Sequence, residues 1–266
     1  MKTVKDRNIE NNNIKNQILE KLDEIETREN VKVLYAVESG SRAWGVESPD
    51  SDYDVRFIYM RPKEDYIRLD EVKDFIEWQL DDVLDINGWD IKKTLIQFHK
   101  GNATLFEWAN SPVVYKNTKT WKNIYSECGQ YFSRKAALCH YYGTARSTYE
   151  KYLNQDNVKY KKYVYALRPL LACKYIEENG KVPPVRFDEL MRQKIDGRLY
   201  DEINKMLEVK SHSKEKTLNP QNETIFQYIK EELAKYEFLS QTAEEDRNSD
   251  WDVLNGIFRK ICEGGI

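Results

Sequence analysis

The sequence predicts an α+β protein, in which a mixed sheet with helices is followed by an all-helical C-terminal half. Short β-prone runs separated by turn residues occupy the chain up to about residue 115. Helical periodicity with few breaks fills nearly all of the remainder. The 266 residues are 40% hydrophobic and 33% charged, a composition typical of a globular protein with room for two small domains.

The chain up to residue 47 predicts one helix, one strand and a tight turn. The run 31–37, VKVLYAV, is rich in β-branched residues and predicts a buried strand. The run ends at Glu38-Ser39-Gly40-Ser41, which suits a tight turn into a short helix over 41–47. Apolar residues at helical spacing predict an amphipathic N-terminal helix: Ile14, Ile18, Leu22 and Ile25.

Three more β-prone runs complete the expected sheet. They cover 53–60, 74–80 and 83–86, and turn residues separate the last two. Asn87 is expected to cap a helix that opens directly after the fourth strand. We expect a mostly antiparallel sheet with its helices on one side.

The second half predicts a helical bundle. Polar and Pro-Gly breaks divide it into helices expected near 121–153, 158–179, 186–209, 220–241 and 250–262. The change from mixed to all-helical pattern places a domain boundary between 1–115 and 116–266. We expect a nucleotide cleft between the two domains.

Composition excludes several classes of protein. A net charge of -3 argues against a globally basic nucleic-acid binder. No apolar run of about 18 residues suggests a membrane span, and the polar start does not resemble a signal peptide. The cysteines form no CxxC pair, which indicates reduced thiols in a cytoplasmic protein: Cys128, Cys139, Cys173 and Cys262.

One segment indicates chemistry. Gly40-Ser41 is followed, after ten residues, by Asp52-Tyr53-Asp54 at the start of a predicted strand. Alternate strand residues share a face, so both carboxylates project together, and a divalent cation would relieve their repulsion. Backbone N–H groups at the Gly-Ser turn can bind a phosphate. The pattern therefore predicts a site for Mg²⁺ or Mn²⁺ and a nucleoside triphosphate.

This pattern resembles the active-site signature of the DNA polymerase β nucleotidyltransferase superfamily. The run GSRAWGVESPDSDYDVRFIY is similar to predicted nucleotidyltransferases of the YcgL-like family. DINGWDIKKTLIQFHKGNATLFEWANSP and YKKYVYALRPLLACKYI extend the resemblance over about residues 31–180. It implies two metal ions and transfer of a nucleoside monophosphate from an NTP to a hydroxyl, with release of pyrophosphate.

The resemblance also implies site residues. Asp52 and Asp54 would bind both metal ions. A third carboxylate is expected on a neighbouring strand, where Asp85 is favoured and where three other acidic residues compete: Glu77, Asp81 and Asp82. Asp85 would bind only the metal ion that activates the acceptor hydroxyl and would take the proton of that hydroxyl.

Candidate nucleotide-binding residues lie in both halves. Gly40, Ser41 and Arg42 belong to the turn, although Arg42 also suits a solvated helix face. In the second half, Lys161 and Arg168 share a helix face that would close over the triphosphate, or would simply be solvated.

Other residues near the motif have competing interpretations. Arg56 shares the face of the aspartates, and pairing with one of them is favoured over a phosphate contact. Trp44 suits the core or a lid over the turn. The run Lys159-Lys161-Lys162 is a short candidate for nucleic-acid contact.

The leading functional hypothesis is therefore a metal-dependent nucleotidyltransferase. Its acceptor hydroxyl would belong to RNA, a nucleotide, a protein or a small molecule. One alternative is a catalytically silent NTP-binding regulatory module. Another is a toxin–antitoxin component that acts on tRNA or protein. The sequence does not determine the base, the acceptor or the oligomeric state.

Overall fold

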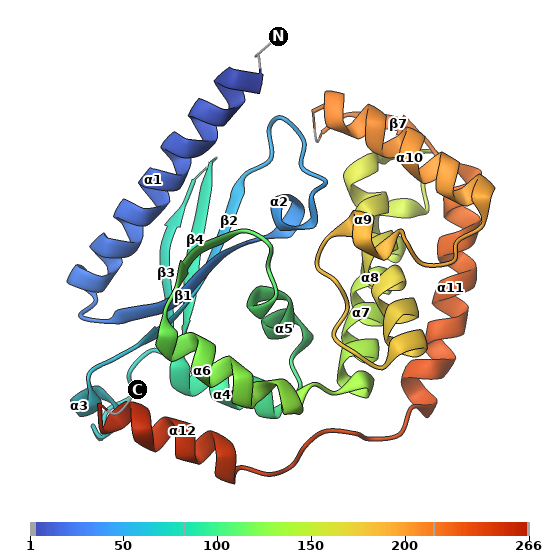
Figure 1. Ribbon diagram of the computed structural model, residues 1–266. Helices are drawn as coiled ribbons and strands as arrows, with labels where there is room; N and C mark the ends of the chain where they lie inside the picture. The colour runs from blue at the N-terminus through green and yellow to red at the C-terminus, as the bar shows by residue number, and fades with distance from the viewer. Residues whose placement is uncertain (1–3, 82, 215, 265–266) are drawn as a thin grey trace.

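The computed structural model describes residues 4–81, 83–214 and 216–264 and has two packed units (Figure 1). The first is built on a five-stranded sheet in the order β3-β4-β2-β1-β5. β2 and β4 are parallel, and the other neighbours are antiparallel. The strands are β1 (Lys32–Ser39), β2 (Tyr53–Met60), β3 (Phe75–Leu80), β4 (Leu84–Asp90) and β5 (Val114–Asn117).

The register of the central strands determines which residues meet at one end of the sheet. β1 ends where β2 begins, so Ser39 pairs with Asp54. β4 runs parallel to β2, and Asp54 pairs with Asp85. The turn after β1 and the first residues of β2 and β4 therefore lie together.

Helices cover both faces of the sheet. Ile18, Leu22 and Ile25 of α1 (Val4–Arg28) pack against one face. The opposite face packs against α4 (Ile91–His99), α5 (Ala103–Ala109), α6 (Lys119–Cys128) and α12 (Asp252–Cys262). The expectation of helices on one side was wrong, because the central strand β1 is buried at six successive positions and thus needs cover on both faces.

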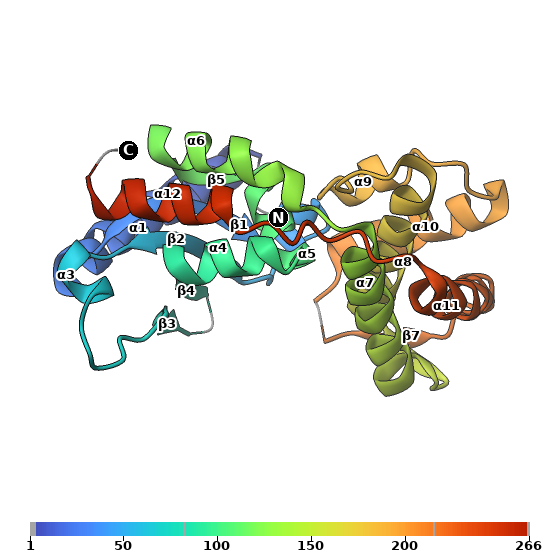
Figure 2. The same cartoon turned by 90° about the horizontal axis from the view of Figure 1, so that it is seen from below.

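The second unit is a helical bundle around a buried central helix (Figure 2). That helix, α8 (Tyr160–Asn179), packs against α7 (Arg134–Thr148) and α11 (Glu223–Thr242). α9 (Phe187–Leu190) and α10 (Gly197–His212) complete the bundle. A two-stranded ribbon, unexpected from the sequence, pairs β6 (Asn157–Lys159) with β7 (Leu218–Pro220).

Three predicted boundaries were wrong. The helix predicted over 186–209 is two helices, α9 and α10, which residues 191–196 separate. Asn87 does not cap a helix, because β4 continues to Asp90, whose side chain accepts a hydrogen bond from Lys92 N at 2.7 Å and caps α4. The helix predicted over 121–153 is α6, a 3₁₀ turn η1 (Gly129–Tyr131), α7 and a π-helical turn η2 (Tyr149–Leu153). Ser133 interrupts it by capping α7, since its hydroxyl accepts from Ala136 N at 3.0 Å.

The C-terminal helix returns to the first unit. α12 packs against α4 and α6, and Leu254, Ile257 and Ile261 enter the same core as Trp121 of α6. Both helices therefore belong to the core of the sheet unit, although they follow residue 115 in the chain. Within the part of the chain described, no helix combines the length and the apolar character needed to cross a bilayer.

Candidate active site

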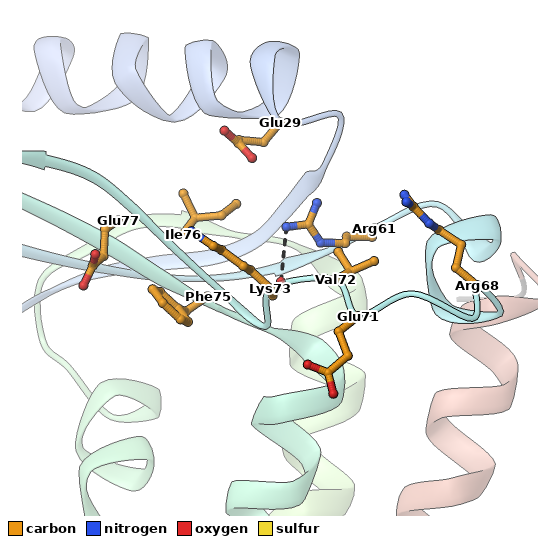
Figure 3. Close-up of a pocket in the computed structure, with 9 residues that line it drawn as sticks. All are labelled: Glu29, Arg61, Arg68, Glu71, Val72, Lys73, Phe75, Ile76 and Glu77. Atoms are coloured by element: carbon orange, nitrogen blue, oxygen red, sulfur yellow. Dashed lines mark hydrogen bonds between the residues drawn. The ribbon is translucent and has the colours of Figure 1, made fainter.

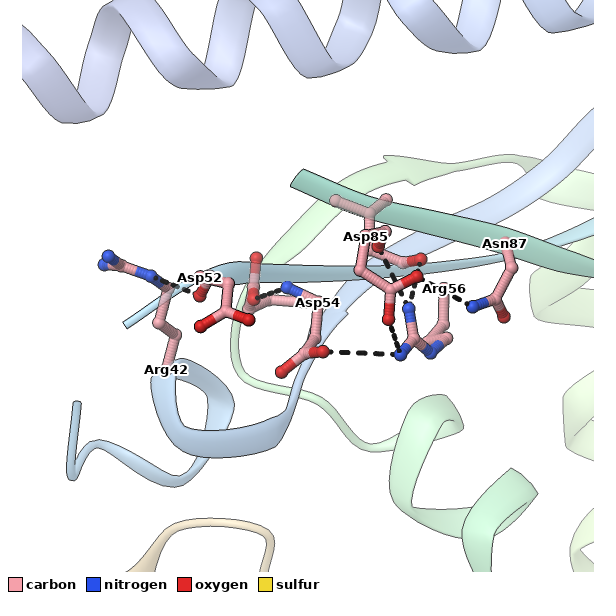
Figure 4. Close-up of polar contacts among 8 residues, drawn as sticks. Arg42, Asp52, Asp54, Arg56, Asp85 and Asn87 are labelled. Carbon is pink, nitrogen blue, oxygen red and sulfur yellow. Dashed lines mark hydrogen bonds and ion pairs between the residues drawn. The ribbon is translucent and has the colours of Figure 1, made fainter. Parts of the chain in front are cut away.

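Two carboxylates lie side by side at the end of the sheet, joined by one arginine (Figure 4). Arg56 Nη2 lies 2.7 Å from Asp85 Oδ2 and 3.3 Å from Asp54 Oδ1. Its Nη1 donates to the carbonyls of Val55 and Asp85 at 3.0 Å. Arg56 thus pairs with the aspartates, as favoured from the sequence.

The turn before α2 (Gly40–Trp44) approaches Asp54 closely. Gly40 has a φ of +61°, and a Cβ there would lie 2.2 Å from Asp54 Oδ2. Ser41 is buried beside it. The turn requires glycine for two reasons: left-handed backbone and direct contact with a carboxylate.

Glu38 is a buried acid that accepts a hydrogen bond from the backbone of Asp54. Its side chain is 1% exposed, and its Oε1 accepts from Asp54 N at 2.7 Å. The Tyr115 hydroxyl donates to its Oε2. Burial raises the pKa of Glu38 to about 7, against the effect of these hydrogen bonds. Sequence reasoning assigned Glu38 only to the turn; an acidic residue ending an otherwise apolar strand was the available signal.

Neighbouring charges shift the pKa of Asp54 in opposite directions. Burial raises the pKa of the Asp54 carboxyl most strongly, and Arg56 lowers it. Asp85 and Asp52 raise that pKa further, while Lys161 of α8 lowers it. Lys161 is thus a charge of the helical unit that acts on this pKa.

Arg42 is engaged with the loop that carries Asp52. Its Nε donates to the Asp52 carbonyl at 2.9 Å, and its Nη2 donates to the Ser51 carbonyl at 2.6 Å. The guanidinium also lies 3.7 Å from the centre of the Tyr53 ring. These contacts give Arg42 a structural role, while its predicted contact with nucleotide stays a prediction.

Arg168 is placed differently from Lys161. Its side chain is 2% exposed and pairs with Glu107 of α5 at 2.6 Å. Nε donates to the Val185 carbonyl at 3.1 Å, and the guanidinium lies 4.6 Å from the Trp44 ring centre. The structure therefore places Arg168 inside the contact between the two units, where Trp44 packs against it.

The competitors for the third carboxylate lie elsewhere. Asp81 Oδ1 accepts from the N–H groups of Val83 and Leu84 and so shapes the β3–β4 turn. Glu77 pairs with Asn87 across β3 and β4, further along the sheet. Asp82 lies outside the described residues. Asp85 is the acidic residue that the register places beside Asp54.

The carboxylate oxygens of Asp54 and Asp85 suit a hard divalent cation, but in this structure both carboxylates pair with Arg56. Carboxylate oxygens are the ligands that Mg²⁺ and Mn²⁺ prefer. Across 4–81, 83–214 and 216–264, however, no three His, Cys, Asp or Glu side chains converge as a metal site requires. Arg56 lies between Asp54 and Asp85, where its charge offsets their repulsion.

A separate cavity of about 390 Å³ opens near the other end of β2 (Figure 3). Its charged lining includes Arg61, Arg68 and Lys73 together with Glu29 and acidic neighbours. Arg61 Nη2 donates to the Lys73 carbonyl at 3.4 Å. None of the aspartates of the candidate site lines it.

Comparison with known proteins decides the family. Residues 14–260 match the model of RlaP, the RNA repair pathway DNA polymerase beta family. The chain belongs to this family. It is 40% identical over 252 residues to the uncharacterized protein YcgL of Bacillus subtilis (strain 168), covering 94% of this chain and 97% of that protein. The general activity associated with the RlaP family is nucleotidyl transfer.

A solved structure is also similar. The nucleotidyltransferase-like protein from Exiguobacterium sibiricum 255-15 aligns with 93% of this chain and 80% of its own, at 14% identity and a TM-score of 0.30.

Proposed function

We propose that this RlaP-family protein transfers a nucleoside monophosphate from an NTP to a hydroxyl group of RNA. The observation that carries the proposal is the register that places Asp54 against Asp85, with the Gly40 turn on Asp54. A carboxylate pair beside a Gly-Ser turn at the end of a strand suits nucleotidyl transfer, which needs metal ligands next to a phosphate site.

The roles of the residues follow from their positions. Asp52 and Asp54 would hold the divalent ions, Mg²⁺ or Mn²⁺, which supply charge neutralisation to the triphosphate when bound. Arg56 would turn away from Asp54 to allow this. Asp85 would then accept the proton of the acceptor hydroxyl, whose oxygen bonds to the α-phosphorus. The bond from that phosphorus to the bridging oxygen breaks, and pyrophosphate leaves.

Contacts to the triphosphate would come from both units. The Gly40–Ser41 turn lies on Asp54, and Lys161 stands near enough to influence that carboxyl. Arg42 and Arg168 would act by holding the Asp52 loop and α2, since their guanidinium groups already bind protein carbonyls or Glu107.

RNA is the favoured acceptor for two reasons. The RlaP family is described by its RNA repair pathway. Lys159 and Lys162 also flank Lys161 at the start of α8, and Lys162 Nζ lies 3.7 Å from the centre of the half-exposed Tyr152 ring. Lysines beside an exposed aromatic ring suit a phosphate backbone with a stacked base.

The four free cysteines agree with a reducing compartment such as the cytoplasm.

A silent NTP-binding module is the second candidate, favoured by one observation. Arg56 already offsets the repulsion between Asp54 and Asp85, which favours a site that is stable without metal. Such a module would bind NTP without releasing pyrophosphate.

The test uses α-³²P-labelled ATP, GTP, CTP and UTP with Mg²⁺ or Mn²⁺ and RNA oligonucleotides that carry 5′- or 3′-hydroxyl ends. We expect label to enter RNA with the wild type and not with the double variant Asp52→Ala/Asp54→Ala. Asp201→Ala, an exposed acid of α10, is the matched control. Metal-dependent NTP binding without transfer would support the silent module, and transfer by a folded double variant would remove the proposed mechanism.

A further inference from the structure

The loop between α2 and β2 carries Asp52 and is held by a lysine of the helical unit. Lys210 of α10 is 4% exposed. Its Nζ donates to the Val46 carbonyl and, at 2.9 Å, to Ser48 Oγ. Ser48 is 3% exposed, and its hydroxyl lies 3.4 Å from the Lys210 carbonyl. The contact joins residues 162 positions apart in the chain.

Hydrogen bonds inside the loop continue this contact toward Asp52. Ser48 N donates to Ser51 Oγ at 3.0 Å, and Ser51 N donates to the Ser48 carbonyl at 3.1 Å. Arg42 then binds the carbonyls of Ser51 and Asp52. A connected series of contacts thus runs from Lys210 through Ser48 and Ser51 to Asp52.

Lys210 occupies a position where the helix pattern calls for an apolar side chain. Leu199, Ile203 and Met206 form the buried face of α10, and the next position on that face is 210. An ammonium group in such a position is unfavourable unless it is hydrogen-bonded. Its bonds to Val46 and Ser48 supply that compensation, so the lysine has a specific partner in the loop.

The same helix is linked to Lys161. After α10 the chain forms β7, whose Leu218 pairs with Lys159 of β6. α8 begins at Tyr160, directly after β6, and Lys161 is its second residue. α10, β7, β6 and the start of α8 thus follow one another through chain connection and strand pairing.

We propose that Lys210 is a positioning residue that fixes Asp52 relative to Asp54 by holding the 45–52 loop against α10. This inference rests on the proposed function for its catalytic consequence. The fixing of the loop itself is measurable without catalysis.

The experiment compares Lys210→Met with Lys205→Met in the full-length protein. Lys205 is a neighbouring lysine of α10 that is 70% exposed and pairs with Glu202 at 2.8 Å, so its loss leaves the loop untouched. Hydrogen exchange of the Ser48 and Ser51 amides reports the loop, and Mn²⁺ binding followed by electron paramagnetic resonance reports Asp52. For Lys210→Met we expect exchange at least about tenfold faster and weaker Mn²⁺ binding, with unchanged exchange in β1 and β2.

Kinetics separate positioning from general damage. With the labelled-NTP assay, we expect Lys210→Met to lower kcat by about tenfold or more while the KM for NTP changes little. Ser48→Ala removes the bond from Lys210 to Ser48 Oγ and leaves the bond to the Val46 carbonyl, so we expect a smaller rise in the exchange of the Ser51 amide. This variant tests the contact if Lys210→Met does not fold.

Failure of the positioning role and failure of the proposed function give different results. Wild-type exchange at Ser48 and Ser51 in a folded Lys210→Met protein would overturn the positioning role, and so would wild-type exchange at Ser51 in a folded Ser48→Ala protein when Lys210→Met does not fold. Faster exchange in a protein whose wild type transfers no label would support the positioning of the loop and would instead defeat the proposed function.

Discussion

Gly40 determines both the backbone conformation of the turn and the space available to the Asp54 carboxylate. Its positive φ lets β1 turn directly into α2, and its missing side chain leaves room for Asp54 Oδ2. Because the carboxylate and the turn occupy adjacent space, a phosphate bound by the turn amides would lie next to a metal bound by Asp54.

We therefore predict that Gly40→Ala sharply reduces transfer activity. A Cβ at 2.2 Å from Asp54 Oδ2 must displace that carboxylate, and alanine adds about 1–2 kcal/mol of left-handed backbone strain. Activity should fall by roughly a hundredfold or more, as for a misplaced reacting group. The measurement is the labelled-NTP assay, paired with thermal denaturation.

Gly143→Ala is the control for this prediction. Gly143 lies in α7, and a Cβ there meets no atom within 4 Å. This variant should keep full activity and gain slightly in stability, because alanine is the better helix former. Full activity in Gly40→Ala would mean that the turn does not position Asp54.

At the scale of the elements, the junction of β4 and α4 depends on one buried acid. Asp90 is 3% exposed, caps α4 through Lys92 N and accepts from the Tyr66 hydroxyl at 2.9 Å. Burial raises the pKa of Asp90 to about 6, even though these hydrogen bonds and Arg61 oppose the rise. The junction therefore favours the neutral acid more than the unfolded chain does.

The sign of the pH effect follows. A raised folded pKa means that the folded state binds the Asp90 proton more tightly, so this contribution to stability is full below pH 4 and is lost as pH rises to about 6. Asp90→Asn removes the titration. The unfolding free energy of wild type minus that of Asp90→Asn should decrease between pH 4 and pH 7, by on the order of a few kcal/mol.

Urea denaturation at several pH values measures this difference. Asp201→Asn, an exposed position on α10, should show no comparable trend. A difference between wild type and Asp90→Asn that is constant from pH 4 to pH 7 would contradict the predicted titration.

At the scale of the whole molecule, an ion pair between buried Arg168 and partly buried Glu107 joins the two units. Arg168 of α8 meets Glu107 of α5 and lies over Trp44 of α2, whose ring also packs edge-on against Tyr165 at 5.1 Å. Among the described residues, Arg168 Nη2 is buried without a hydrogen-bond partner. The bundle thus contacts the helix that begins with the Gly40–Ser41 turn.

We predict that Arg168→Met destabilises the protein by about 3–5 kcal/mol, because it leaves Glu107 without its buried partner. The double variant Arg168→Met/Glu107→Gln should recover part of that loss, since no unpaired charge remains. Glu150→Gln, which breaks an exposed pair with Arg146, should cost less than about 1 kcal/mol. Denaturant unfolding of the four proteins gives the free energies. Equal effects of Arg168→Met and Glu150→Gln would show that the buried pair does not join the units.

Local patterns in the sequence determined much of the fold. Residues 53–60 were predicted as a strand and are β2, and the helices predicted over 158–179 and 220–241 lie close to α8 and α11. The Gly40–Ser41 turn, the spacing of Asp52 and Asp54 and the pairing of Arg56 were also readable. The turn and the spacing depend on neighbours within a few residues, and so does the pairing of Arg56 with Asp54. The shorter contact of Arg56 with Asp85 joins residues 29 positions apart.

Contacts between segments that are far apart in the chain were decided only by the tertiary structure. β4 could have joined the sheet at either edge; its parallel pairing with β2 is what brings Asp85 to Asp54. Glu38 and Lys210 acquire their partners only when strands and helices pack. Packing also buries Arg168, whose helix face the sequence predicted either to be solvated or to close over the triphosphate. The hydrophobic periodicity of a helix or strand predicts the face of that element on which a side chain lies. The residue that this side chain contacts depends on which other element packs against that face.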